Sequence, residues 1–382
     1  MKKHIFSITF ALICFTACAQ TDSVQIYTNR DYYDVEKIIY QAKDENPNIK
    51  NVILMIGDGM GLTQLYAGMT TNRGSLYLEN CKHIGLSKTY SSSSYITDSA
   101  AGATAFSTGQ KTYNGAIGVD KDGNPLKTIL EMAEEKGMAT GLVATSKITH
   151  ATPAAFIAHQ KDREMYEAIA ADFLDTDIDV FIGGGKRGFE IREDGRNLLN
   201  ELESKNYTIV EDVNKLSKVK KGKLAGLLHD DHLPNVKGMN GKPGRGDMLQ
   251  KSTDAALNLL SRSKDGFFLM IEGSQIDWGG HSNFSWYIAE EMMDFDKSVG
   301  QVLKFAANDG ETLVIITADH ETGGFALTDG DIASGTIGGM FTSSYHTGVM
   351  VPVFAFGPGA EELMGIYENT EIFNVMVRAL GL

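Results

Sequence analysis

Short apolar segments alternate with helical patterns along the chain from residue 51 onward. The expected strands are 51–56, 140–143, 179–182, 266–271, 312–317 and 349–356, and the expected helices are 126–135, 165–173, 248–261, 287–306 and 369–380. Short continuous apolar runs are typical of parallel strands that are buried on both faces. The alternation therefore predicts an α/β fold in which a mostly parallel central sheet is sandwiched between helices.

The length and the charge of the chain limit its function. With 382 residues, 42% of them apolar, the chain can bury a large core, and α/β architectures of this size often form one domain. Its 35 Lys and Arg residues against 49 Asp and Glu residues give a formal net charge of −14. This charge repels polyanions and argues against a nucleic acid as a partner. An anionic substrate would have to be attracted by local cations.

The first 19 residues have the features of a secretory signal peptide. Lys2 and Lys3 precede the apolar run 5–15, and small residues follow it. The run is shorter than the ~20 residues that a membrane-spanning helix needs. We therefore predict an exported protein whose signal peptide spans residues 1–19.

Two processing sites are compatible with this signal. The tripeptide Ala17-Cys18-Ala19 suits a peptidase that recognises small residues, whereas residues 15–18 resemble a lipoprotein signal in which Cys18 is acylated. The first alternative predicts a periplasmic protein, and the second predicts a protein anchored to the outer membrane through a lipid on Cys18.

Polar segments divide the remaining chain. Residues 20–45 are expected to form a polar N-terminal tail, in which 31–43 could be a short helix, and residues 46–382 are expected to form a single domain. Within that domain the polar, glycine-rich segments 218–247 and 321–345 are expected to be excursions from the sheet. The second of them could rim an active site.

Acidic residues follow three of the expected strands. Asp58, Glu272 and Asp319 each stand one or two residues beyond the end of a strand. A single carboxylate in such a place is commonly a helix cap or part of a turn. Because ligand sites in open α/β sheets lie beyond the carboxyl ends of the strands, three carboxylates at this edge predict a polar site there.

Histidines with neighbouring carboxylates extend this set. Asp277 and His281 are four residues apart, a spacing that lets both reach one ion if the backbone there is helical. Asp319 and His320 are adjacent, so both could ligate one ion only if the chain has left its strand. His346 supplies a further imidazole. A mixed nitrogen and oxygen set suits Zn²⁺, whereas an all-oxygen subset suits Mg²⁺.

Residues 97–105 have the pattern of a helix start. Thr97 or Asp98 would cap the helix, and small residues follow. Ser99 would then lie in the first turn, beside free backbone amides and the positive end of the helix dipole, which suit an attached phosphate.

Arg163 is the candidate cation for an anionic substrate. Residues 149–153 are expected to turn into a helical stretch that reaches Arg163, with Pro153 at the first helical position. Arg163 is either an ordinary surface charge or a guanidinium that grips two oxygens of a tetrahedral anion. The local sequence leaves both interpretations open.

Seven segments between residue 51 and the C-terminus resemble the alkaline phosphatases, metal-dependent phosphomonoesterases of the exported bacterial and animal type. The segments are Asp58-Gly59-Met60-Gly61, Thr97-Asp98-Ser99-Ala100-Ala101-Gly102-Ala103-Thr104-Ala105, Lys111-Thr112-Tyr113-Asn114-Gly115, His150-Ala151-Thr152-Pro153, Glu272-Gly273-Ser274-Gln275-Ile276-Asp277, Asp319-His320-Glu321-Thr322-Gly323-Gly324 and His346-Thr347-Gly348. The related sulfatases carry Cys or Ser followed by x-Pro-x-Arg, a motif that residues 99–102 lack.

The resemblance implies an alkaline-phosphatase-like three-layer architecture with short insertions and a metal-dependent catalytic site. It implies two Zn²⁺ ions and one Mg²⁺, or another divalent ion in the third place. The implied ligands are Asp277, His281 and His346 for the first zinc, Asp58, Asp319 and His320 for the second, and Asp58, Thr152 and Glu272 for the third ion.

The resemblance also implies the reaction and its residues. Small phosphate monoesters would be hydrolysed through a phosphoserine intermediate on Ser99, releasing inorganic phosphate and an alcohol. Arg163 would clamp the phosphate, Asp98 would orient Arg163, and Trp278 would face the substrate. A homodimer is expected by analogy with the family.

Two positions depart from the best-known enteric bacterial pattern of this family. That pattern has aspartate and lysine where this chain has His150 and Trp278, and the pair instead resembles the cold-adapted bacterial alkaline phosphatases. Losing the carboxylate is expected to weaken the preference of the third site for Mg²⁺, because Mg²⁺ prefers oxygen ligands.

We predict that His150→Asp makes activity more dependent on Mg²⁺ without abolishing it. The measurement is turnover against Mg²⁺ concentration for the wild type and the variant at fixed Zn²⁺. An unchanged Mg²⁺ dependence would show that the residue at position 150 does not set the metal preference.

Overall fold

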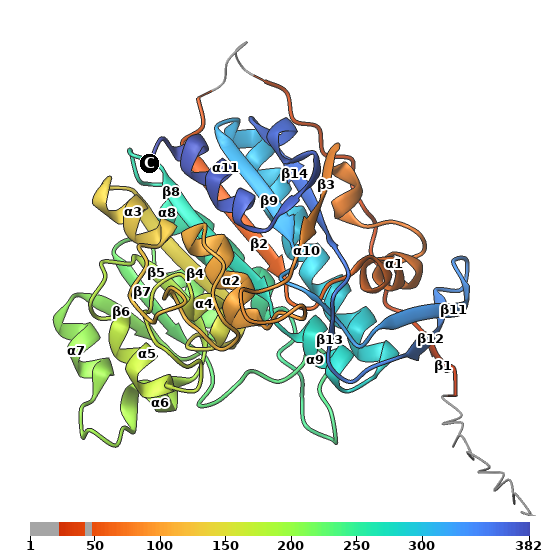
Figure 1. Cartoon of the computed structure of the whole chain (residues 1–382), viewed down its shortest axis with the longest axis horizontal. Coiled ribbons are helices and arrows are strands. Elements are labelled where there is room, and N and C mark those ends of the chain that lie inside the picture. The colour runs from red at the N-terminus through yellow and green to blue at the C-terminus, as the bar shows by residue number, and fades with distance from the viewer. Residues whose placement is uncertain (1–22, 43–47) are drawn as a thin grey trace, which may run out of the picture.

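A ten-stranded sheet forms the centre of the molecule in the computed structural model, which describes residues 23–42 and 48–382 (Figure 1). In sheet order the strands are β15 (Gly365–Glu368), β3 (His83–Lys88), β14 (Val351–Phe356), β9 (Thr312–Thr317), β2 (Asn51–Gly57), β8 (Phe267–Gly273), β4 (Ala139–Lys147), β5 (Val180–Gly184), β7 (Lys223–Leu227) and β6 (Tyr207–Val210). From β9 to β6 all neighbours are parallel, whereas β14 is antiparallel to both β3 and β9. The predicted mostly parallel sheet is confirmed.

Helices cover both faces of this sheet and enclose two cores. One core includes α1 (Leu62–Thr71), α8 (Met248–Leu260), α9 (Gln275–His281) and α10 (Ser285–Asp309). The other includes α2 (Ser99–Thr108), α3 (Ile129–Glu135), α4 (Ala151–Ala154), α5 (Tyr166–Asp172), α6 (Lys186–Glu190), α7 (Leu198–Ser204) and α11 (Thr370–Leu380). In β2, Ile53 and Met55 belong to the first core, and Val52, Leu54 and Ile56 belong to the second. Burial on both faces explains why this strand is apolar throughout.

Two small antiparallel sheets lie outside the central one. β1 (Gln25–Thr28), β12 (Thr336–Phe341) and β11 (Phe325–Asp331) form a three-stranded sheet, and β10 (Glu321–Thr322) pairs with β13 (His346–Thr347) (Figure 1). Segment 321–345 is therefore an excursion from the central sheet, as predicted. Segment 218–247 is different, because it contributes β7 to the central sheet.

Every strand and helix expected in the alternation from residue 51 onward overlaps an observed one, but two further local expectations were wrong. The described part of the expected helix 31–43, residues 31–42, is not helical. The expected helix toward Arg163 ends at Ala154, and Arg163 lies in a turn before α5. The hydroxyls of Ser107 and Thr128 bind the carbonyls of residues 155 and 156, so side chains replace the next helical hydrogen bonds.

The first described segment packs closely on the rest of the chain. Tyr33 stacks on Tyr77 with ring centroids 5.9 Å apart, and the Ile38 amide donates to Asn80 Oδ1 at 2.7 Å. The buried Asp296 carboxylate accepts hydrogen bonds from the Tyr33 hydroxyl at 2.6 Å and from the backbone amides of Tyr77 and Leu78 at 2.7 and 3.1 Å. The polar groups of this segment therefore form hydrogen bonds with residues far away in the chain, and not the hydrogen bonds of a helix.

The predicted signal peptide 1–19, both processing sites and the lipid anchor on Cys18 lie outside the described residues. Among the residues that are described, no helix is both long enough and apolar enough to cross a membrane.

We predict that Asp296→Ala lowers the free energy of unfolding by about 3 kcal/mol, because two backbone amides and a hydroxyl lose their buried acceptor. Tyr33→Phe removes only one of these hydrogen bonds and keeps the ring stack, so it should cost about 1 kcal/mol. Urea denaturation of the metal-loaded protein measures both values. Equal losses for the two variants would show that the bonds to the backbone amides contribute nothing.

Candidate metal centre and phosphate site

Carboxylates and imidazoles gather in three clusters at the carboxyl edge of the central sheet. The clusters are Asp277 with His281 and His346, Asp58 with Asp319 and His320, and Asp58 with His150 and Glu272, and the candidate ligand atoms in each lie within 4.8 Å of one another. The strand register explains the convergence, because Ile56 pairs with Glu272 on one side and with Thr317 on the other. Asp58 therefore stands between the ends of β8 and β9.

The first cluster has the hydrogen-bonding pattern of histidines that bind a metal. Asp277 and His281 lie one turn apart on α9, and His281 Nε2 is 3.1 Å from His346 Nε2. The two Nδ1 atoms each lie 2.8 Å from a backbone carbonyl, that of Ser344 for His281 and that of Thr97 for His346. If both Nδ1–H groups donate to these carbonyls, both Nε2 lone pairs point into the cluster.

The second cluster is fully buried. His320 Nε2 lies 3.5 Å from Asp58 Oδ1, 3.3 Å from Asp319 Oδ2 and 3.4 Å from Ser99 Oγ. Adjacent residues can both reach one cluster only where the chain has left its strand, and β9 ends at Thr317, before Asp319 and His320. Burial and then the neighbouring Asp319 raise the pKa of Asp58, and burial lowers the pKa of His320.

The third cluster includes a residue that the family resemblance does not name among the metal ligands. His150 lies with Asp58 and Glu272, while Thr152, the expected ligand, stands on α4. Burial raises the pKa of Glu272 to about 7, although Glu272 Oε2 accepts a hydrogen bond from Ser274 Oγ at 2.7 Å. His150 is therefore close enough to these two carboxylates to belong to the cluster by its position.

Five buried oxygens at these clusters have no hydrogen-bond partner. They are Asp58 Oδ1 and Oδ2, Thr152 Oγ1, Glu272 Oε1 and Asp319 Oδ2. Unpaired buried carboxylates destabilise a protein by several kcal/mol unless a counter-charge satisfies them. The donor set therefore fits divalent cations.

A serine on the neighbouring helix and an arginine in a distant turn complete the site. Ser99 is the first residue of α2, and Asp98 caps that helix, with its Oδ1 accepting from the Ala101 amide at 3.0 Å. Asp98 Oδ2 accepts from the Gly115 amide at 2.9 Å and from Arg163 Nη1 at 3.0 Å. The helix cap thus also holds the guanidinium, so Arg163 is bound to the residue that precedes Ser99 although Ser99 and Arg163 are 64 positions apart in the chain.

Two contacts at this site carry no local signal in the sequence. The Thr322 hydroxyl donates to the Asp277 carboxylate and lies 3.2 Å from His320 Nδ1, so it touches a ligand of each of two clusters. The His232 ring lies 4.8 Å from the Trp278 ring and 5.4 Å from the His150 ring. A lone histidine in a polar loop gives no hint of such a contact.

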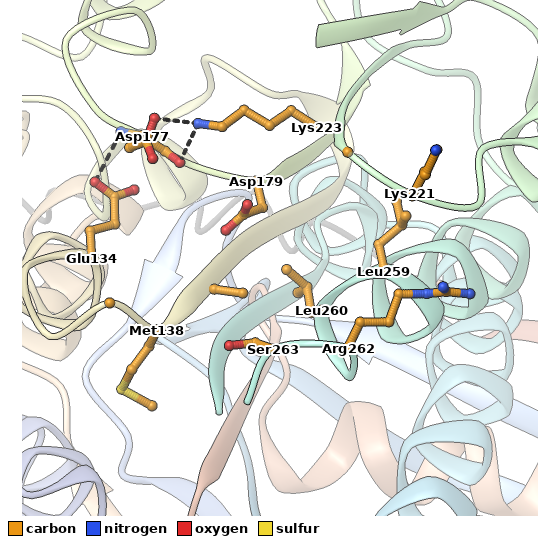
Figure 2. A pocket seen from close by; sticks show the side chains of 13 residues that line it. Glu134, Met138, Asp177, Asp179, Lys221, Lys223, Leu259, Leu260, Arg262 and Ser263 are labelled. Carbon is orange, nitrogen blue, oxygen red and sulfur yellow. Dashed lines mark hydrogen bonds and ion pairs between the residues drawn. The ribbon is translucent and has the colours of Figure 1, made fainter. Parts of the chain in front are cut away.

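A pocket of about 450 Å³ lies at the opposite edge of the sheet, where β4, β5 and β7 begin (Figure 2). Four of its charged groups are bound to neighbours: Lys223 Nζ pairs with Asp177, Glu134 accepts from the Asp177 amide at 3.0 Å, and Asp179 accepts from the Thr140 amide at 3.0 Å. None of the predicted site residues lines it. The chemistry is concentrated at the carboxyl edge.

The fold and these clusters define a metal-binding protein of the α/β class. A family model described as alkaline phosphatase matches residues 49–338 and 336–382. The chain is 37% identical to "Alkaline phosphatase 3" of Bacillus subtilis, over 89% of this chain and 91% of that protein, and 33% identical to the alkaline phosphatase of Escherichia coli, over 87% and 86%. The chain belongs to the alkaline phosphatase family, and its activity is the hydrolysis of phosphate monoesters.

Solved structures agree with this assignment. The alkaline phosphatase from the Antarctic bacterium TAB5 is 44% identical and superposes with a TM-score of 0.83 over 88% of this chain and 99% of that one. A cold-active alkaline phosphatase from a psychrophilic Shewanella is 32% identical, with a TM-score of 0.78 over 86% and 99%. The expected family and its resemblance to cold-adapted members are confirmed.

We predict that a chelator lowers the melting temperature by about 5 °C or more, because removing cations that bind only the folded protein removes their stabilisation. Asp58→Asn should reduce this shift. It lowers the melting temperature of the metal-loaded protein because a metal ligand is lost. The melting temperature of the chelated variant should equal or exceed that of the chelated wild type, because the substitution relieves the repulsion between carboxylates. Differential scanning calorimetry measures both. A wild-type melting temperature that ignores the chelator would contradict metal binding at these clusters.

Proposed function

We propose that Ser99 is the nucleophile of this phosphomonoesterase and that Arg163 binds the phosphate. The observation that supports this most directly is the position of Ser99 Oγ, which stands at the N-terminus of α2 and 3.4 Å from His320 Nε2. There the free amides of the helix and the cationic guanidinium of Arg163 favour a dianionic phosphoryl group.

The reaction consists of two displacements at phosphorus. Ser99 Oγ loses its proton and forms a bond to phosphorus while the bond to the leaving oxygen breaks, and the departing alkoxide takes up a proton to give the alcohol. Water then loses a proton and attacks the phosphoserine, the bond between Ser99 Oγ and phosphorus breaks, Ser99 Oγ takes up a proton, and inorganic phosphate leaves. Arg163 holds two phosphoryl oxygens in both steps, and Asp98 fixes the direction of its guanidinium.

We further propose two Zn²⁺ ions and one Mg²⁺, or another divalent ion in the third place. The first two clusters contain imidazoles with carboxylates, as Zn²⁺ prefers, while Glu272 and Thr152 offer oxygen to the third. Such ions, when bound, supply the positive charge that stabilises a serine alkoxide and the phosphoryl oxygens. A TAB5 alkaline phosphatase in which a histidine is replaced by aspartate carries Mg in its M3 site, which supports a link between His150 and metal preference.

The remaining proposals concern the setting of the enzyme. The N-terminal pattern supports a signal peptide at 1–19 and export, with the protein either free in the periplasm or anchored to the outer membrane through Cys18. We further propose a polar N-terminal segment 20–45 followed by a single catalytic domain 46–382. Its substrates would be small phosphomonoesters, and Trp278 would face them. A homodimer is proposed by family analogy.

We predict that Ser99→Ala reduces turnover of p-nitrophenyl phosphate at mildly alkaline pH at least about 1,000-fold, because the covalent route is lost. The assay compares chelated protein with protein resupplied with Zn²⁺ and Mg²⁺, and acid-quenched samples are searched by mass spectrometry for phosphate on Ser99. The exposed neighbour Ser92→Ala is the matched control and should retain wild-type turnover. A phosphorylated residue other than Ser99, or full activity in Ser99→Ala, would refute the assignment.

A further inference from the structure

Three aromatic rings from separate segments meet beside the Arg163 guanidinium. His150 follows β4, His232 lies in the loop between β7 and α8, and Trp278 is on α9. The ring centroids are 5.4 Å apart for His150 and His232, 4.8 Å for His232 and Trp278, and 6.2 Å for His150 and Trp278, with interplanar angles of 80°, 88° and 87°. All three pairs are edge-to-face, the arrangement that aromatic quadrupoles favour.

The contact between His150 and Arg163 depends on how the imidazole is oriented. Arg163 Nη2 lies 3.3 Å from His150 Nε2, and a guanidinium only donates, so Nε2 must accept and the neutral ring carries its proton on Nδ1. That Nδ1 is buried and has no hydrogen-bond partner. Apart from the contact with Arg163, the described part of the structure shows no hydrogen bond of the His150 side chain, and the ring also packs against the rings of His232 and Trp278.

His232 itself is held firmly. Its Nδ1 accepts from the Lys147 amide at 3.2 Å, and its own amide donates to Asp231 Oδ1 at 2.9 Å. The carbonyl of the next residue, the buried Leu233, accepts from Gln275 Nε2 at 2.9 Å. These bonds tie the loop to β4 and to α9, the elements that carry the other two rings.

A buried ion cluster fastens the far end of the same loop. Arg245 Nη1 binds Glu291 Oε1 at 2.9 Å, and its guanidinium also pairs with Asp294, both on α10. The Val236 amide donates to Glu291 Oε1 at 2.8 Å. Because both ends of the loop are fixed, the position of the His232 ring is set by the fold.

We propose that His232 is a positioning residue for phosphate binding: its ring braces His150 and Trp278, and thereby fixes the direction in which Arg163 presents its guanidinium to the phosphoryl group. The inference rests on the proposed assignment of Arg163 to the phosphate. It gives a role to a histidine outside every segment that carries the family resemblance.

The test separates the ring of His232 from its hydrogen bond. His232→Asn keeps an acceptor for the Lys147 amide but removes the ring, whereas His232→Phe keeps a ring but removes the acceptor. One charge-assisted hydrogen bond lost between a misdirected Arg163 and the anion corresponds to roughly tenfold weaker binding of inorganic phosphate. We expect this loss in His232→Asn, and a dissociation constant within about twofold of wild type in His232→Phe.

Binding is measured on the metal-loaded enzyme, apart from turnover, through the fluorescence of Trp278 in a Trp286→Phe background, since the chain has two tryptophans. Steady-state kinetics with p-nitrophenyl phosphate should show the same tenfold rise in KM for His232→Asn with kcat within about twofold, because ground state and transition state lose the same contact. The melting temperature should stay within about 2 °C of wild type, which a merely structural role would not predict.

Two further variants make the outcomes distinct. His229→Leu, on the same loop and exposed, is the matched control and should bind phosphate as the wild type does. Arg163→Ala must weaken phosphate binding if the proposed function is right, so failure of that variant to do so refutes the assignment of Arg163. If Arg163→Ala weakens binding but His232→Asn does not, or if His232→Phe loses as much as His232→Asn, positioning by the ring is refuted.

Discussion

The mutual repulsion of buried carboxylates is the constraint on which the rest of this structure depends. Asp58, Glu272, Asp277 and Asp319 are almost completely buried at one edge of the sheet, and three of them carry oxygens with no hydrogen-bond partner. Without counter-ions Asp58, Glu272 and Asp319 would gain protons or separate, as the raised pKa of each of these three carboxyls indicates. Divalent cations turn the same repulsion into a binding site, and the fold must be rigid enough to hold the carboxylates together.

The parallel sheet supplies that rigidity. β8, β2 and β9 are neighbours in register, with apolar cores on both faces, so their carboxyl ends cannot move apart without exposing buried side chains. The helices that follow contribute their first turns, where Ser99 and Asp277 stand. The clusters that fit divalent cations and the Arg163 guanidinium lie together at this edge, so an anion is attracted there although the chain has a large net negative charge.

The proposed phosphate site around Arg163 has a different origin, since it depends on residues that hold other residues. Asp98 caps α2 and binds Arg163 with the same carboxylate, which couples the helix that carries the serine to the cation that faces it. On the other side of Arg163, His150 is packed against rings from a distant loop and from α9. Positioning at this site thus comes from three separate parts of the chain.

The sequence by itself determined the α/β class, the core strands and the edge at which the chemistry lies. Continuous apolar runs specify buried parallel strands, and a residue directly after such a run, as Asp58, Glu272 and Asp319 are, must reach the carboxyl edge. The helical spacing of Asp277 and His281 was likewise readable, because four residues make about one turn. Only the tertiary structure decided that residues 31–42 form no helix, that Arg163 turns back to Asp98, and that His232 packs on His150 and Trp278. These contacts join residues far apart in the chain, and long-range packing leaves no periodic pattern in the local sequence.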